Sequence, residues 1–194
     1  MNSPNHVLIG SIVYEYLREK YGITLQKSSF LKGNTCPDHG ISFFRPHKMK
    51  YCGRMVQRKT ERLFDGGRSM SGKTSKKIGI LCHYYSDFFC CAHNPQFSGS
   101  LREHRRYEEC LLHFMSDNYD AFRKFDYVPG TVKRETAREI SRKMDLLLLE
   151  RPTAEGDYAE ELFCAIRACA ELVLSICLSA VFSRPEAAPG FSRA

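Results

Sequence analysis

The sequence predicts an all-α protein that folds as a single domain. Apolar side chains recur with helical spacing along most of the chain, whereas the alternation typical of β-strands is almost absent. At 194 residues, with 43% hydrophobic and 26% charged residues, the chain is long enough to bury its own core. We expect one helical domain over residues 1–182 and a disordered, Pro/Ala/Gly-rich tail over residues 183–194.

Seven helices are expected from the apolar spacing and from the residues that start or stop helices. Gly22 ends the first helix, Ser98 begins the fifth and Thr131 begins the sixth. The fourth is too apolar for a surface helix, so we expect it at the centre of the fold, ending at Asn94-Pro95. The expected helices span residues 6–21, 25–31, 49–64, 75–93, 98–125, 131–149 and 154–182.

The last of these helices is apolar enough to be compared with a membrane span. Its longest uncharged stretch runs from Leu172 to Ser183, which is shorter than the roughly 20 residues that a bilayer requires. We therefore expect a core helix or a partner-packing helix, and no transmembrane segment.

The formal net charge of +7 is concentrated in one stretch. Residues 45–77 hold eleven Lys or Arg side chains against two acidic ones, Glu61 and Asp65. Such a stretch is either a solvated loop and helix face or a surface that attracts an anionic substrate. The sequence leaves both interpretations open.

Cysteine usage predicts the compartment. The chain holds nine cysteines, an odd number, and its start lacks the positive segment and the small-residue cleavage pattern of a secretory signal. We therefore expect a cytoplasmic protein with reduced thiols.

The strongest functional signal is a set of metal-binding side chains at helical spacing. His83 and Asp87 are four residues apart, which on a helix puts both on one face, with Cβ atoms roughly 5–6 Å apart. His93 lies too far along the expected helix to join the same ion easily, and it is placed to begin a second site. His104 and Glu108 repeat the four-residue spacing on the next expected helix.

These side chains need partners because unpaired polar groups on a buried helix are costly. Asp38 and His47 lie in the loop-rich segment upstream and extend the set of possible ligands. The spacings therefore predict a multinuclear metal site between facing helices. Cys90 and Cys91 could also bind zinc, although we favour their interpretation as small apolar residues at a helix interface.

A second motif competes with the metal site. Gly67–Thr74 matches the phosphate-binding loop pattern G-x-x-x-x-G-K-[ST]. That motif requires a buried strand immediately before it, yet the preceding segment is charged and helical in pattern. We expect a chance match, which leaves a P-loop nucleotide-binding protein as a remote alternative.

The order of the metal-binding residues carries a family resemblance. The pattern consists of His6, Gly33-x-x-x-Pro37-Asp38, His47, His83-x-x-x-Asp87-x-x-x-x-x-His93 and His104-x-x-x-Glu108. It resembles the bacterial zinc-dependent phospholipase C family over about residues 6–125, and the remaining helical sequence is compatible with the all-α fold of that family. More distantly, it is similar to the fungal and plant zinc nucleases that cut single strands.

The resemblance implies two or three bound zinc ions. In the family, the third site is completed by the amino and carbonyl groups of an N-terminal Trp, and this chain has no Trp. The third site could use the N-terminus of Met1, take extra waters or be empty. The implied ligands are Asp38, His47, His83 and Asp87 for one zinc, His93, His104 and Glu108 for a second, and His6 with a shared Asp87 for a third.

The resemblance also implies the activity, which is zinc-dependent hydrolysis of a phosphodiester, with a phospholipid or a related phosphate ester as substrate. Asp38 would be both a ligand and the catalytic residue that orients or deprotonates the attacking water. Phe44 matches an aromatic position of the family's choline pocket. His39 replaces a family Tyr and the family's N-terminal Glu has no counterpart, so choline specificity is poorly supported.

Two alternatives of other kinds stay open. The basic stretch of residues 45–77 mildly favours a nuclease that uses the same zinc cluster. A non-catalytic protein whose zinc holds the helices together would have closed, four-coordinate sites, whereas a catalytic site keeps an open position.

Overall fold

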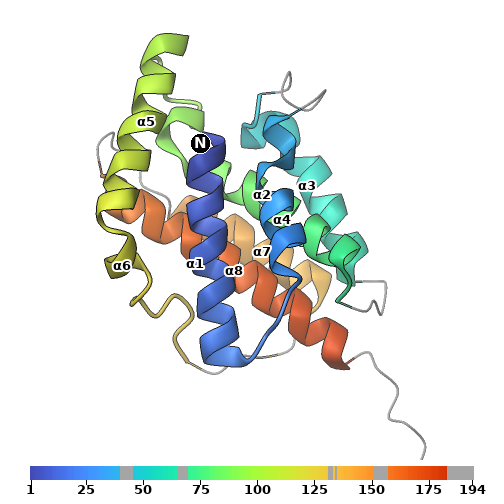
Figure 1. Cartoon of the computed structure of the whole chain (residues 1–194). Helices are drawn as coiled ribbons and strands as arrows, with labels where there is room; N and C mark the ends of the chain where they lie inside the picture. Colours follow the sequence, from blue (N-terminus) through green and yellow to red (C-terminus); the bar gives the residue numbers. More distant parts are fainter. Residues whose placement is uncertain (40–45, 65–69, 131–132, 134, 151–156, 183–194) are drawn as a thin grey trace, which may run out of the picture.

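The computed structural model describes residues 1–39, 46–64, 70–130, 133, 135–150 and 157–182. Within these residues the chain forms eight α-helices and two short 3-10 helices, η1 and η3, and no strand, which confirms the all-α prediction (Figure 1). The expected tail at 183–194 lies outside the described residues. The helices are α1 Ser3–Tyr21, α2 Lys27–Thr35, η1 Cys36–Asp38, α3 Met49–Phe64, α4 Gly72–Phe89, η3 Cys91–His93, α5 Leu101–Asp117, α6 Tyr119–Phe122, α7 Ala137–Leu149 and α8 Tyr158–Phe182.

Side-chain caps explain where four of the helices begin. Asn2 and Ser71 each accept a backbone N–H from the first turn, so α1 and α4 start three residues earlier than expected. Ser100 and Thr136 form capping boxes, which place the starts of α5 and α7 later than the sequence predicted. The fifth expected helix is also divided, because α5 ends at Asp117 and the short α6 follows.

The expectation that the fourth helix continues to His93 was wrong. The helix ends at Phe89, and Cys90 has an extended backbone with φ −68° and ψ 125°. The N–H of Cys91 donates to the Glu161 carboxylate at 3.0 Å instead of continuing the helical ladder. His93 therefore lies on η3, outside the helix that carries His83.

Helices α4 and α8 form the centre of the fold. Helix α8 contacts α1, α3, α4, α5 and α7, and it crosses the bundle in Figure 1. Its segment Tyr158–Ser179 is long and apolar enough to cross a membrane, but 78% of the most apolar stretch of this segment is buried inside the protein. This position is that of a core helix, as the sequence predicted.

Helix α2 packs directly against α4 through two glycines. A Cβ atom on Gly33 would lie 2.2 Å from the carbonyl oxygen of Lys76, and one on Gly79 would lie 2.1 Å from that of Phe30. Any larger residue would force the helices apart, so only glycine allows this approach. The contact fixes Asn34, the residue after Gly33, against the helix that carries His83.

The segment around the phosphate-loop pattern has no P-loop architecture among the described residues. Helix α3 precedes the pattern where a strand would be required, and Gly72 and Thr74 belong to the first turn of α4. Residues 65–69 lie outside the described part of the chain.

Candidate metal centre

The eight predicted ligands come together at the end of the bundle where α1 begins, near the N label of Figure 1. They arrive from α1, η1, the segment before α3, α4, η3 and α5. Phe44, the predicted substrate-binding residue, lies outside the described residues. The ligand atoms form three groups, each within 4.8 Å, of which the first two share His83: His6, His83 and Asp87; Asp38, His47 and His83; and His93, His104 and Glu108.

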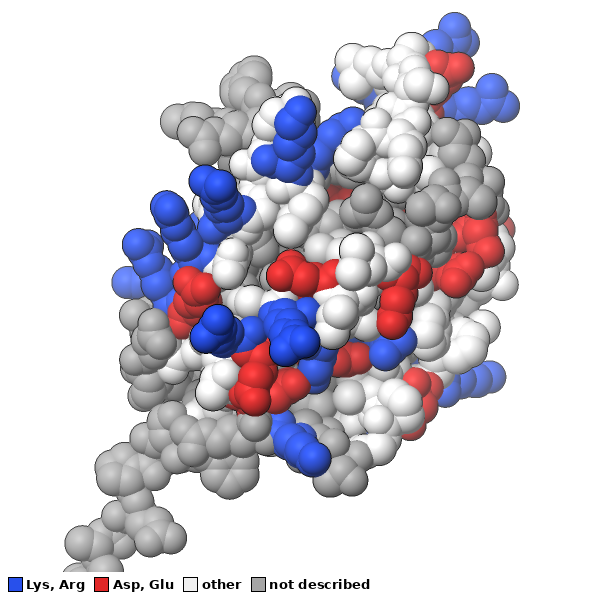
Figure 2. Space-filling view, turned by 180° about the vertical axis from the view of Figure 1, so that it is seen from behind, with Lys and Arg blue, Asp and Glu red and all other residues white. Residues whose placement is uncertain are grey.

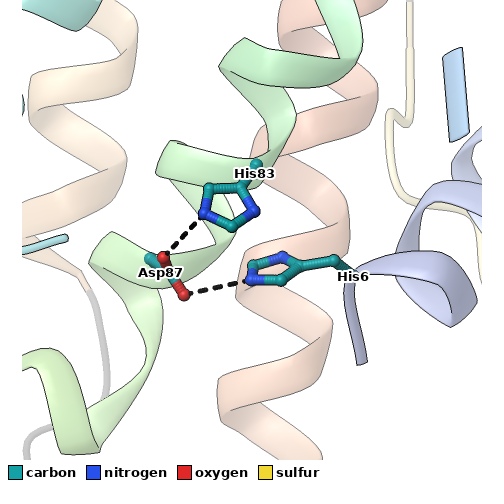
Figure 3. A group of neighbouring side chains, drawn as sticks. All are labelled: His6, His83 and Asp87. Carbon is teal, nitrogen blue, oxygen red and sulfur yellow. Dashed lines mark ion pairs between the residues drawn. The ribbon is translucent and has the colours of Figure 1, made fainter. Parts of the chain in front are cut away.

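The buried carboxylate of Asp87 faces two of these groups at once. Its Oδ2 lies 3.1 Å from His47 Nδ1 and 3.3 Å from His83 Nε2. Its Oδ1 lies 3.3 Å from His6 Nε2 and 2.5 Å from the amino group of Met1. Figure 3 shows the rings of His6 from α1 and His83 from α4 one above the other, each facing a different oxygen of this carboxylate. The arrangement suits the bridging role that the resemblance implies for Asp87, which stays a prediction.

Backbone carbonyls fix the orientation of two histidine rings. The Nδ1–H of His83 donates to the carbonyl of Asn34 at 2.8 Å, and that of His93 donates to the carbonyl of His47 at 3.2 Å. Because a carbonyl can only accept, each ring keeps its proton on Nδ1 and turns the lone pair of Nε2 inward. This outer-shell pattern is typical of histidines that bind metal ions.

His6 is oriented in the same way by a serine. The hydroxyl proton of Ser86 is committed to the carbonyl of His83 at 2.9 Å. The Ser86 oxygen therefore accepts from Nδ1–H of His6 at 3.0 Å, which leaves Nε2 of His6 facing Asp87. Three histidines thus direct Nε2 toward the carboxylates of Asp87 and Glu108, a donor set that fits Zn²⁺.

The third group is built around Glu108. Its Oε1 lies 2.9 Å from His104 Nε2, one turn earlier on α5, and 3.1 Å from His93 Nε2. The departure of η3 from the axis of α4 brings His93 to this position. The structure therefore brings together the three residues that the resemblance assigns to a second zinc.

Asp38 lies at the side of the centre that is nearer to solvent. Its Oδ2 accepts a hydrogen bond from Ser3 at the start of α1, at 2.6 Å. Its Oδ1 faces His83 Nε2 at 3.7 Å and His47 Nδ1 at 3.9 Å. The short α1–η1 contact thus holds one oxygen and directs the other to the histidines.

Met1 lies among the candidate ligands with both its amino group and its carbonyl oxygen, the two groups that the resemblance implies for an N-terminal ligand. Its amino group lies 2.5 Å from Asp87 Oδ1, 2.9 Å from His93 Nε2 and 3.1 Å from Glu108 Oε1. Its carbonyl oxygen lies 3.1 Å from His6 Nε2. Of the three outcomes left open for the third site, this geometry favours the use of Met1.

Burial and charge shift the pKa values of the centre in different directions. Burial, with His83 adding to it, lowers the pKa of His6 to about 4, so the ring is neutral at pH 7. Burial opposes the charges of Asp87 and Glu108, but nearby histidines and the Met1 amine hold both pKa values well below the usual range. Burial likewise opposes the charge on the Met1 amine, yet Asp87 and other neighbours raise its pKa.

Without metal, the protein is expected to be most stable between about pH 6.5 and pH 8. Below pH 6.5 the unfolded chain protonates His6 while the folded chain does not until about pH 4, so stability falls as the pH falls. Above pH 8.0 the unfolded chain loses the Met1 amino proton that the folded chain keeps, so stability falls again. Urea unfolding with chelator at pH 5, 7 and 9 measures this, and equal midpoints at pH 5 and 7 would contradict it.

Sequence reasoning missed Glu161, a buried carboxylate on α8 behind the third group. Its Oε2 accepts from the N–H of Cys91 at 3.0 Å and from the hydroxyl of Tyr107 at 2.7 Å. Cys91 begins the 3-10 helix that carries His93, and Tyr107 immediately precedes Glu108. Glu161 therefore ties together the two elements that carry the third group, and no local signal in the sequence indicates this.

Glu161→Ala is expected to empty the third group and to lower stability by about 2–4 kcal/mol, because two buried donors lose their acceptor. Burial raises the pKa of Glu161, so the negative charge is unfavourable at this position. The N–H of Cys91 and the hydroxyl of Tyr107 require only an acceptor oxygen. Glu161→Gln keeps that oxygen and should retain most of the metal. The measurement is zinc content together with urea unfolding of both variants. Equal zinc content in Glu161→Ala and the parent chain would disprove the positioning role.

The two cysteines considered as ligands do not join the groups. Cys90 and Cys91 are both buried, and neither belongs to a cluster of candidate ligand atoms among the described residues. Burial raises the pKa of the Cys90 thiol, which disfavours the thiolate that would bind zinc. Their packing role is the interpretation that the structure favours.

Comparison with known proteins gives one match. The family model described as zinc-dependent phospholipase C matches residues 5–153, about three quarters of the chain, including all eight predicted ligands. Searches of curated proteins and of solved structures find no significant match. Together with the three clusters of ligand atoms, the match confirms the resemblance seen in the sequence: the chain belongs to the zinc-dependent phospholipase C family.

Proposed function

We propose that the protein is a zinc-dependent phosphodiester hydrolase that acts on a phospholipid or a related phosphate ester. The observation that carries this proposal is the inward orientation of the His6, His83 and His93 rings around the carboxylate of Asp87. A set of neutral imidazoles and carboxylates fits zinc, and several such groups side by side fit the multinuclear chemistry of phosphodiester cleavage.

An open cavity beside the candidate ligands favours catalysis over a purely structural role. The cavity has a volume of about 440 Å³, and Asp38, His47, His93, His104 and Glu108 contribute to its lining. Structural zinc sites are closed by four protein ligands, whereas these groups face a space that a substrate can enter. The cavity is thus the feature that argues against the zinc-stabilised, non-catalytic alternative.

Asp38 is the proposed catalytic residue. It lines the cavity, and Ser3 holds its Oδ2, so its Oδ1 is available to accept a proton from the attacking water. Bound zinc supplies Lewis-acid polarisation of the phosphoryl oxygens and lowers the pKa of nearby water. His47 and His83 limit the movement of Asp38 and keep its free oxygen near the reacting centre.

The experiment is hydrolysis of bis(4-nitrophenyl) phosphate by protein loaded with zinc, with the chelated protein as control. We expect turnover that zinc restores after chelation and that magnesium does not. Protein that binds zinc but hydrolyses neither this ester, short-chain phospholipids nor single-stranded DNA would favour the structural role instead.

The nuclease alternative rests on the basic stretch, whose cations are exposed along α3. The face seen in Figure 2 has Lys and Arg gathered at one edge, but Asp and Glu lie among the basic side chains across the rest of it. This mixture does not favour a continuous track for a nucleic acid backbone. We therefore keep the phospholipid as the first candidate substrate.

The proposed location is the cytoplasm. All nine cysteines have free thiols, and Cys82, Cys90 and Cys169 are fully buried. Free thiols in this number are typical of a reducing compartment. This location would restrict the substrates to those present inside the cell.

A further inference from the structure

The mouth of the cavity carries two cations that the metal centre does not use. Lys48 follows His47 in the segment before α3, and Arg105 follows His104 on α5. In Figure 1, α3 and α5 lie on either side of the start of α1, so the two lining cations come from segments on different sides of α1. Neither side chain forms an ion pair with a described residue, so both charges remain available to a ligand.

No acidic side chain in the described lining opposes these cations, apart from candidate metal ligands. The acidic residues that line the cavity are Asp38 and Glu108, and both face the histidines. Bound zinc ions would outweigh the carboxylates of the centre, which makes the whole cavity positive. A positive mouth attracts an anionic headgroup more strongly than a zwitterionic headgroup that ends in a quaternary ammonium cation.

The same mouth presents an apolar side chain. Leu101, at the first turn of α5, is 68% exposed and lines the cavity beside Arg105. An apolar side chain next to two cations fits the boundary between a lipid's glycerol region and an anionic headgroup.

We propose that the substrate is a phospholipid whose headgroup carries a second phosphate, bound by Lys48 and Arg105 at the cavity mouth. This inference rests on the proposed hydrolase function and adds the class of headgroup. The scissile phosphodiester lies against the metal ligands, and the second phosphate lies between the two cations. Charge-assisted hydrogen bonds from an ammonium and a guanidinium group are the strongest that side chains offer to a phosphate.

The reaction balances with water as the only co-reactant. The oxygen of water forms a new bond to phosphorus, and the bond between phosphorus and the glycerol oxygen breaks. One proton of the water passes by way of Asp38 to the glycerol oxygen, and the other ionises from the product phosphate. The products are diacylglycerol and a headgroup that carries two phosphate monoesters.

The test compares three dihexanoyl lipids below their micelle-forming concentrations, which separates recognition in the cavity from attraction to a charged surface. The headgroups are choline, glycerol and inositol 4-phosphate. We expect the lipid with inositol 4-phosphate to have the highest kcat/KM, by about ten-fold or more. Lys48→Ala and Arg105→Ala should each raise its KM about ten-fold and change the KM for the glycerol headgroup less than about two-fold.

A matched control comes from the same helix. Arg106 is exposed on α5 and lines a different cavity, so Arg106→Ala should leave all three KM values unchanged. Unchanged zinc content and helical circular dichroism of each variant exclude a loss of folding. Charge reversal with Arg105→Glu should shift the preference toward the choline lipid, which simple loss of a contact would not do.

The possible outcomes separate this inference from the proposed function. If zinc-loaded protein does not hydrolyse bis(4-nitrophenyl) phosphate, the hydrolase function fails and the inference fails with it. If that ester is hydrolysed but the three lipids react equally, or the choline lipid reacts fastest, the headgroup inference alone is overturned. Cleavage of a single-stranded oligonucleotide faster than every lipid would replace the lipid with a nucleic acid substrate.

Discussion

Asp87→Asn is expected to abolish phosphodiester hydrolysis and to remove more zinc than His104→Ala. The two oxygens of Asp87 face different ligand groups, so an amide in its place removes negative charge from both and presents an NH₂ to one of them. The buried histidines and the Met1 amine, which lower the pKa of Asp87, would also lose their counter-charge. His104 contacts Glu108 and the ring of His93, both members of the third group, so its loss should leave the other two groups intact.

The measurement is zinc per chain and turnover of bis(4-nitrophenyl) phosphate for both variants. Asn has nearly the size of Asp, so the substitution creates no cavity. A loss of zinc would therefore result from the loss of the negative charge and of the bridging oxygen. Unchanged zinc content and unchanged turnover in Asp87→Asn would show that Asp87 is not a bridging ligand. The ligand assignment built around it would then be wrong.

Removal of the metal is expected to have the second large effect. The purified protein should carry two or three zinc ions, and the ligands come from separated segments that zinc holds together in the folded state only. One ion present at 1,000 times its dissociation constant stabilises the folded state by about 4 kcal/mol. For a chain of this size, its removal should lower Tm by about 8–16 °C.

Metal analysis after purification without chelator tests the first part, and thermal unfolding with and without chelator tests the second. Adding zinc back should restore Tm, which separates metal loss from irreversible damage. Less than about one ion per chain, together with a Tm that chelator does not change, would rule out the cluster.

The sequence was sufficient for the helical class but not for the end of α4. Apolar spacing predicts the buried helix and its central place, and Asn94-Pro95 predicts its end. The actual end depends on the hydrogen bond from Cys91 to Glu161, a residue 70 positions later. Periodicity within a segment carries no information about such a contact. The predicted end of the helix was therefore wrong in the segment that positions His93.

The ligands were predictable to a larger extent than the groups that orient them. Helical spacing indicated His83 with Asp87 and His104 with Glu108. Asp38 and His47 were candidates from the segment upstream, and the family resemblance added His6. Ser86, Asn34 and Ser3 have no pattern that distinguishes them from other polar residues. Their roles arise from hydrogen bonds between elements, which only the folded structure reveals.

The backbone contact between α2 and α4 makes two glycines, neither of which offers a ligand atom, responsible for the protonation pattern of His83. A single methyl group at Gly33 or Gly79 would separate the helices and withdraw the Asn34 carbonyl from His83 Nδ1. The proton could then reside on Nε2, and the ring would offer a hydrogen where a lone pair is needed. Close packing at a helix crossing thus determines which nitrogen of an imidazole carries the proton. A substitution at a glycine can therefore weaken metal binding although the glycine has no side chain.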